Sequence, residues 1–276
     1  MKNAQSGGRR PPAEYLADAE QALREFESTL PDSQNVHSSV LEYLGLVSGD
    51  RVVDTESLVT SPFPFLQSHG PYLFGVLATP TNVSDGRSEF TSLVLLASRD
   101  QLVTFIIDPV QSYAGPFGQR IINRQQRHLE SGGDDVGSTL LTVVRDNVTS
   151  LSFAMRELEL DLQHYSKGLL RFDTSRRRDG SRLLQMVEAY LVKLRYEIES
   201  LSTIVEETAV LIEYIGMSHR LERDSTGVFA ESHGISAHAL ATQAKRMVSV
   251  RDRLSRQVVQ LLEKCDRLHE KFFAEA

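Results

Sequence analysis

The last part of the sequence, residues 236–276, has the most regular pattern of apolar positions in the chain. Two series of residues spaced by seven alternate at intervals of four and three: Leu240, Met247, Leu254, Leu261, Leu268, and Ala244, Arg251, Val258, Cys265, Phe272. This spacing places an apolar seam along one side of a long helix, interrupted only by Arg251. No glycine or proline follows Gly234, so the pattern predicts a rod of roughly 60 Å at a rise of ~1.5 Å per residue.

The same pattern predicts two further long helices before this one. The first starts near Ser138, a residue type that favours the N-cap position. Its seam consists of Leu141, Val144, Val148, Leu151, Met155, Leu158, Leu162, Tyr165 and Leu169. The seam of the second consists of Leu184, Val187, Leu191, Leu194, Ile198, Leu201, Val205, Ile212 and Ile215. Polar segments at 172–181 and 216–234 separate the three helices, which together predict a coiled-coil-like helical half.

Upstream of these helices the pattern changes to short runs rich in β-branched residues, which predict strands. The stronger candidates are residues 72–79, 90–98 and 101–108, and the weaker ones are 51–54 and 57–60. Only Arg99 and Asp100 separate the last two strong candidates, so we expect an antiparallel hairpin. Residues 93–97 are almost all apolar, which indicates a strand that is covered on both faces.

Helical patterns at 12–30, 36–46 and 118–129 flank these strands. The predicted fold class is therefore α+β: a small mixed sheet layered between helices (α/β/α), followed by three long helices of which the last is a stalk. We divide the chain into a disordered tail (1–12), an α/β/α domain (13–135), a long helical hairpin with its connector (136–235) and the stalk helix (236–276).

Composition and charge argue against several classes of protein. The formal net charge of −7 argues against nucleic-acid binding, which needs a basic face. No apolar run approaches the ~20 residues of a membrane span, the first twelve residues contain no signal sequence, and we expect this chain to be soluble. The single cysteine, Cys265, lies on the apolar seam and is expected to be buried in a reducing compartment. The predicted stalk has eight basic and five acidic residues, as expected for a solvated face or for a stalk near the cytoplasmic side of a membrane.

Few residues offer catalytic chemistry, and we expect no enzyme, no catalytic residue and no firmly assigned cofactor. The sequence contains no Gly-rich phosphate loop after a strand and no pair of cysteines. His233 and His238 are five residues apart, a poor spacing for two metal ligands, and a surface position is expected for both. Asp134 and Asp135 beside a glycine pair are expected in a solvated loop.

Three further polar groups have simple interpretations. Glu157, Glu159 and Asp161 alternate with leucines and are expected to form a solvated flank beside the seam. The arginines at 176–178 fit a solvated turn between helices better than a phosphate site. Asn147 matches a glycosylation pattern, which carries no meaning without a signal peptide.

The order of the predicted elements and three local motifs resemble the cytoplasmic part of the CorA family of magnesium and divalent-cation channels. Pro64 followed by residues 72–77 (YLFGVL) is similar to a strand of that family. Residues 93–96 and 101–104, followed by an Asp–Pro pair, are similar to its hairpin. Residues 250–255 (VRDRLS) resemble the Leu-Arg-Glu-Arg-Leu-Ser segment of its stalk. The similarity extends from about residue 36 to the last residue.

The resemblance implies a cytosolic regulatory domain of a homopentameric divalent-cation (magnesium) transport channel on the cytoplasmic side of the plasma or inner membrane. In the family the stalk continues into the first membrane span, and a Gly-Met-Asn motif then selects hydrated magnesium. Neither is present in this sequence, so we expect a chain truncated before the spans.

The resemblance carries over no metal ligand. Family members can place carboxylates on the stalk, but no acidic residue occurs here between Glu231 and Asp252. The metal-sensing residues stay unassigned, and the ion is Mg²⁺ or another divalent cation. An alternative function is a soluble oligomeric coiled-coil interaction protein without transport activity.

Overall fold

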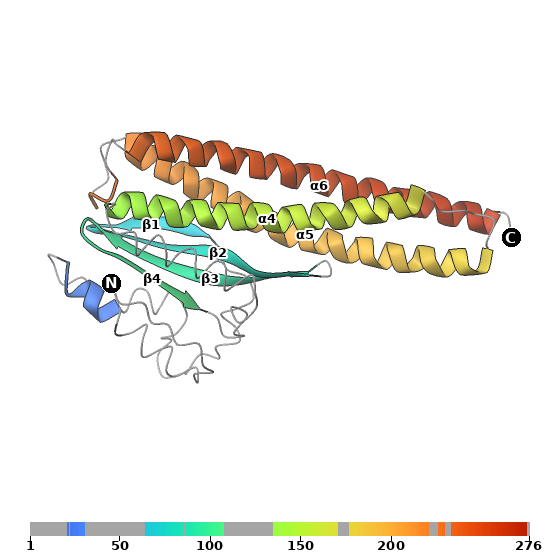
Figure 1. Ribbon diagram of the computed structural model, residues 1–276, viewed down its shortest axis with the longest axis horizontal. Helices are drawn as coiled ribbons and strands as arrows, with labels where there is room; N and C mark the ends of the chain where they lie inside the picture. Colours follow the sequence, from blue (N-terminus) through green and yellow to red (C-terminus); the bar gives the residue numbers. More distant parts are fainter. Residues whose placement is uncertain are drawn as a thin grey trace.

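The structure is a computed structural model, and it describes residues 21, 23–30, 64–84, 87–107, 135–170, 177–220, 226–229 and 233–274. Four strands precede three long helices: β1 (Phe65–His69), β2 (Tyr72–Ser84), β3 (Arg87–Ser98), β4 (Leu102–Ile107), α4 (Val136–Leu170), α5 (Arg177–Arg220) and α6 (Gly234–Ala274). The three helices lie side by side along the long axis of the molecule (Figure 1). The sheet covers only part of their length, so the C-terminal end of α6 projects beyond it. This arrangement confirms the predicted α+β class.

The strands form one sheet in the order β1-β2-β3-β4, and each neighbouring pair is antiparallel. The predicted hairpin is confirmed: β3 and β4 pair, and the Ser98 amide donates to the Gln101 carbonyl oxygen at 2.8 Å. β1 was not predicted, and it joins β2 through a turn in which Gly70 has a φ of 67°. All described strand pairs are antiparallel, whereas a mixed sheet was expected, and the weaker candidates 51–54 and 57–60 lie outside the described residues.

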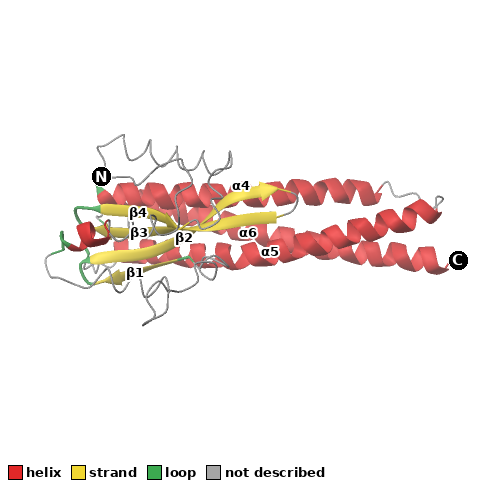
Figure 2. Ribbon diagram, turned by 90° about the horizontal axis from the view of Figure 1, so that it is seen from below, coloured by secondary structure: helices red, strands yellow, loops and turns green. Residues whose placement is uncertain are grey.

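Both faces of the sheet are buried, as the apolar run in β3 predicted. Figure 2 shows the sheet lying across the three long helices. Successive strand residues point to opposite faces, so neighbours in the sequence join different clusters. One face meets the long helices through Leu66, Leu73, Leu77, Leu93, Leu95 and Ala97. The other face meets the described N-terminal helical segment through Tyr72, Phe74, Val76, Val94 and Leu96, against Leu23, Phe26 and Leu30. The described residues of the predicted helix 12–30 therefore form the outer layer.

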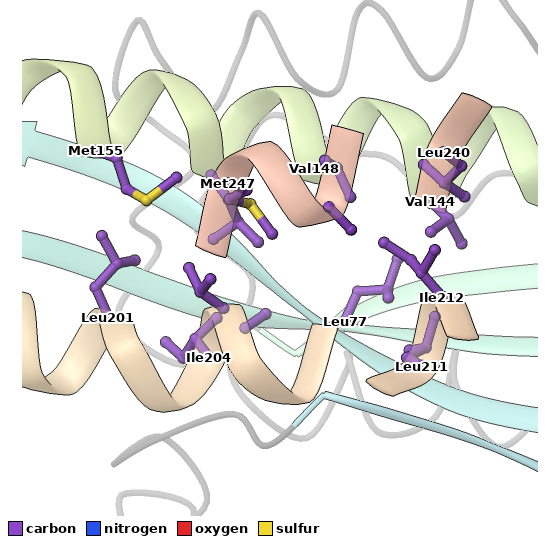
Figure 3. Close-up of a cluster of buried hydrophobic side chains, with 14 of the residues drawn as sticks. Leu77, Val144, Val148, Met155, Leu201, Ile204, Leu211, Ile212, Leu240 and Met247 are labelled. Carbon is purple, nitrogen blue, oxygen red and sulfur yellow. The ribbon is translucent and has the colours of Figure 1, made fainter. Parts of the chain in front are cut away.

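The predicted seams form the interior of the helical half (Figure 3). Val144, Val148 and Met155 of α4 point toward Leu201 of α5 and Met247 of α6, with Leu77 of the sheet nearby. The described residues of this cluster come from the sheet, from all three long helices, and from Val228 and Phe229 between α5 and α6. Burying each Leu, Met or Val side chain contributes about 1.5–3 kcal/mol, so this shared core dominates the packing of the layers.

The helices α4 and α5 begin and end at other residues than predicted. α4 begins at Val136 rather than at Ser138. α5 begins at Arg177 and continues to Arg220, so both predicted polar connectors are shorter than expected. A Cβ at Gly216 would meet nothing within 4 Å, and one glycine costs a long helix only about 1 kcal/mol. The predicted helices 36–46 and 118–129 and the tail 1–12 lie outside the described residues.

Candidate functional site: the stalk helix α6 and its contacts

Helix α6 packs against the rest of the molecule along nearly its whole described length. The buried side of α6, at most 3% exposed at each position, consists of Ala237, Leu240, Ala244, Met247, Leu254, Val258 and Cys265. All of these positions except Ala237 belong to the predicted seam, which packs against α4, α5 and the sheet of the same chain. Ion pairs and hydrogen bonds beside this seam join α6 to α4 and α5 at several heights along the helix.

The start of α6 is joined to the start of α4. Nε2 of His233 lies 2.8 Å from Oδ1 of Asp135, and His233 is only 4% exposed. The same Asp135 oxygen accepts a hydrogen bond from the Ser138 backbone amide at 2.8 Å. Asp135 is therefore the N-cap of α4 and satisfies an amide that the helix itself leaves unpaired. The cap predicted at Ser138 was wrong by three residues, because the preceding acid caps the helix.

This junction also explains the pKa of the Asp135 carboxyl group, which is lowered. The main cause is the hydrogen bond from the Ser138 amide, burial opposes it, and the hydrogen bond and charge of His233 lower it further. The His233 ring lies so close to the backbone of α4 that a Cβ at Gly137 would lie 2.5 Å from Cε1 of His233. The expected surface position is correct for His238, which is exposed, and wrong for His233. Asp135 is solvated as expected, since its side chain is 60% exposed, but it caps a helix rather than lying in a loop.

The middle of α6 carries the one charge on its seam. The Arg251 guanidinium contacts the Glu206 carboxylate of α5, and its Nε lies 2.9 Å from the Asp252 carboxylate. The Arg251 side chain is 13% exposed, whereas Glu206 is 58% exposed. Arg251 thus lays its aliphatic stem along the seam and directs its charged head to the edge of the α5–α6 contact.

On the other side of α6, the contacts reach α4. Nη2 of Arg253 lies 2.7 Å from Oε1 of Glu159, and the Gln243 amide donates to the Thr149 hydroxyl at 3.3 Å. Both contacts join residues 94 positions apart, so α4 and α6 run parallel. Glu159 was expected in a solvated flank, but it is only 23% exposed and is part of an ion pair between helices.

The far end of α6 contacts α5 again. Nε2 of His269 lies 2.9 Å from Oε2 of Glu188. One turn earlier, Cys265 is fully buried, and burial raises the pKa of its thiol to about 11, with Glu188 adding to the shift. The buried cysteine predicted from the seam is confirmed, and such a thiol is a poor nucleophile at neutral pH.

One polar contact holds the helical layer on the sheet. The Asn147 side-chain amide of α4 donates to the Ala78 carbonyl oxygen at 2.8 Å and to the Thr79 hydroxyl at 3.1 Å in β2. Asn147 is 2% exposed, so a glycan could not be attached to it in the folded chain. Its role in the structure is to pair with polar groups of β2 under the helices.

The described residues contain no group of three or more His, Cys, Asp and Glu side chains that could hold a metal ion. Along α6, the exposed residues between Ile235 and Arg256 include Lys245, Arg246 and Arg253, and Asp252 is the one acid. None of the described helices is long and apolar enough to cross a membrane.

The junctions of α6 were largely missed from the sequence. The pairs Asp135–His233, Glu159–Arg253 and Glu188–His269 join distant positions, and heptad spacing does not report the partner across a helix interface. Of these residues, only Asp135 could have been recognised from the sequence. An aspartate three residues before Ser138 fits the N-cap position of a helix, because its side chain can accept a hydrogen bond from the Ser138 amide.

No protein-family model matches the sequence, and no curated protein matches it either. Solved structures do match its fold. The soluble domain of CorA from Methanocaldococcus jannaschii aligns with a TM-score of 0.57 and 12% identity, over 84% of this chain and 83% of that chain. The complete CorA magnesium transporter from the same organism aligns with a TM-score of 0.59 and 10% identity, over 86% of this chain and 67% of that chain.

The cytoplasmic domain of ZntB from Vibrio parahaemolyticus also aligns, with a TM-score of 0.50 and 12% identity, over 85% of each chain. Each of these three alignments covers 84–86% of this chain. The chain therefore has the α+β fold of the CorA-like soluble domains.

Proposed function

We propose that this chain is the cytosolic regulatory domain of a CorA-like divalent metal cation transporter. The observation that carries the proposal is the fold match to both an isolated soluble domain and a complete CorA magnesium transporter. In the complete protein the aligned part is 67% of the chain, which leaves the remainder for a membrane part. The function proposed here is regulatory, with no catalytic residue.

In this proposal the parts of the chain have distinct roles. Residues 13–135 form the α/β/α layer, 136–235 supply the hairpin that supports the stalk, and 236–276 are the stalk that leads to the membrane. The sheet and the helices α4 and α5 would hold α6 through its buried seam and through the ion pairs at Glu159, Glu188 and Glu206. A movement of the sheet and of these two helices would therefore move α6 as well.

We further propose that the working form is a homopentamer with magnesium or another divalent cation as the transported substrate. Metal sensing through carboxylates on the upper stalk is not part of the proposal. Residues 234–251 of α6 contain no acid, and basic side chains are exposed there instead. The preferred ion and the direction of transport depend on the membrane part.

A chimera tests the proposal directly. The soluble domain of the M. jannaschii CorA transporter is replaced by this chain, joined at the end of α6, and the purified protein is reconstituted into liposomes that contain a magnesium-sensitive dye. The expected result is magnesium uptake by a pentamer. The matched control carries Leu254→Asp, which places a charge on a seam position that is 1% exposed and should release α6 from the body.

A chimera that assembles and behaves identically with and without Leu254→Asp would contradict a regulatory role of the stalk packing. The sequence encoded downstream of this chain distinguishes the transporter from the alternative, a soluble coiled-coil interaction protein. A transporter requires two apolar segments of ~20 residues downstream with Gly-Met-Asn between them, whereas an interaction protein does not.

A further inference from the structure

Helix α5 exposes more large apolar side chains than any other described element. Six of the ten that are exposed in the described part of the chain lie on it: Leu183, Met186, Val192, Tyr196, Val210 and Met217. Single exposed apolar residues are normal on a protein surface. Tyr196, Val210 and Met217, which are 67%, 59% and 53% exposed, instead lie at multiples of seven residues and share one face.

This face has the spacing of a second helix-packing seam. The outer seam consists of Tyr196, Glu199, Thr203, Glu206, Val210, Glu213 and Met217, at alternating steps of three and four. It lies on the side of α5 opposite to the buried positions Ile198, Leu201, Val205 and Ile212. A helix with seams on opposite sides can pack against two neighbours. In the described chain α6 meets the outer seam only at its edge, where Glu206 pairs with Arg251.

The charge of the outer seam indicates the kind of neighbour. From Tyr196 to His219, α5 carries five glutamates and no lysine or arginine. Glu199 pairs with Arg195 one turn earlier and Glu206 with Arg251, but the face still has an excess of acidic residues, which disfavours a symmetric α5–α5 contact. The complementary partner is a helix face with basic residues.

The exposed face of α6 has that charge. Lys245, Arg246 and Arg256 are exposed on it, and Asp252 is the one acid between Gly234 and Leu262. Within one chain this face cannot reach the outer seam of α5, because α6 packs on α5 through its opposite, buried side. The two faces can therefore meet only between copies.

The acids and bases of these faces also lie at matching heights along the helices. Contacts of Glu206 with Arg251 and of Glu188 with His269 fix the antiparallel register of α5 and α6. In this register Glu213 is level with Lys245, and Glu199 is nearly level with Arg256. Rotation about an axis parallel to the helices keeps every residue at its height, so a ring of copies brings these charges together.

We propose that the outer seam of α5 binds the exposed basic face of α6 of a second copy of this chain. The contact joins two different surfaces, so it is head-to-tail, and a closed ring satisfies both faces of every copy. The proposal rests on the proposed function, in which copies assemble around a common axis, and it identifies the surfaces that they use.

Cysteine cross-linking tests the contact and its register. Val210 of α5 is level with Met247, whose exposed neighbour Ser249 lies on the basic face. We expect a mixture of the Val210→Cys and Ser249→Cys chains to form mixed disulfide dimers at least tenfold faster than either chain alone. Cys265 does not compete, since it is buried and its thiol has a pKa of about 11.

Leu160→Cys is the matched control, because Leu160 is an apolar residue of α4 that is 48% exposed. Mixing it with Ser249→Cys should give slow cross-linking. Equal rates for Leu160→Cys and Val210→Cys, rapid dimers of Val210→Cys alone, or no cross-link at any protein concentration would each overturn the proposal.

Charge reversal provides the second measurement. One variant carries Glu199→Lys and Glu213→Lys, and the other carries Lys245→Glu and Arg256→Glu. In sedimentation velocity each variant alone should associate on the order of tenfold more weakly than the wild type, because like charges now face each other. An equimolar mixture should recover association, since each altered face meets a complementary one.

Circular dichroism establishes that each charge variant is folded. Unchanged sedimentation of both folded variants, or no recovery in the mixture, would contradict the contact. The cation-uptake test of the chimera is separate: uptake without this contact would overturn the interface alone, and an intact interface without uptake would overturn the transporter function alone.

Discussion

At the scale of single residues, Asp135 combines two roles in one carboxylate. Its pKa is lowered, first by the Ser138 amide and further by His233. The folded chain therefore holds this proton less tightly than the unfolded chain does. The carboxylate contributes stability at pH values above its ordinary pKa, and this contribution is lost as the pH falls through the lower pKa of the folded state.

The variant Asp135→Asn should separate these roles, because an asparagine still caps the helix but carries no charge. We expect a lower free energy of unfolding than wild type at pH 7, and a smaller difference at an acid pH below the lowered pKa of Asp135. Urea denaturation at both pH values measures it. Asp135→Ala should lose a further ~1 kcal/mol at neutral pH, since the cap is then removed. An equal deficit of Asp135→Asn at both pH values would contradict the assignment of the effect to charge.

Two glycines provide a paired test of close packing. A Cβ at Gly137 would lie 2.4 Å from the Val228 carbonyl oxygen, whereas a Cβ at Gly216 would meet nothing within 4 Å. Gly137→Ala should lower the free energy of unfolding by about 1–3 kcal/mol, because the junction of α4 with α6 must open. Gly216→Ala should raise it by up to ~1 kcal/mol, because alanine favours the helix. Chemical denaturation of both variants measures the contrast, and equal effects would exclude a tight junction at Gly137.

At the scale of elements, the α5–α6 contact joins an apolar seam to one ion pair. Replacing Arg251 by leucine continues the seam, and Glu206 is exposed enough to be hydrated without its partner. We therefore expect Arg251→Leu to leave the free energy of unfolding unchanged or to raise it by ~1 kcal/mol. Glu206→Ala should lower it by about 0.5–1 kcal/mol, because the arginine head then loses its contact on α5.

A double-mutant cycle with both changes measures the coupling between Arg251 and Glu206. Its expected value is below about 1 kcal/mol, as for other partly exposed pairs. If Arg251→Leu instead cost more than ~2 kcal/mol, the charge would contribute more to the α5–α6 contact than an apolar side chain does. The seam interpretation of this position would then be wrong.

The sequence predicted these long helices because an amphipathic helix reports its own buried side. Leu240, Met247 and Leu254 recur at a period that only a helix can place on one side, and they are buried as expected. The same spacing does not identify the opposing element, so the contacts of Arg253 with Glu159 and of His269 with Glu188 were not foreseen. Strand β1 was missed because five residues give too short an alternation, and its pairing with β2 stabilises it.

At the scale of the whole molecule, one face of the sheet and the three long helices share one core. The sheet contributes Leu77 and Leu93 to the same buried cluster as α4, α5 and α6. Asn147 adds hydrogen bonds between α4 and β2 within this interface. The described strands and the helices α4, α5 and α6 differ in pattern along the sequence, but each contributes its apolar face to this common cluster.

This shared core predicts that the sheet and the long helices unfold together. Removing α4 from β2 would expose Leu77 and Val148, both fully buried, at a cost of several kcal/mol. In native-state hydrogen exchange, amides of β2, α4 and the middle of α6 should open with the same free energy. Asn147→Ala should lower all three by about 1–3 kcal/mol, because the buried carbonyl oxygen of Ala78 loses its donor. A variant that lowered the protection of β2 alone would show that the sheet unfolds independently, and the stalk could then not be controlled through it.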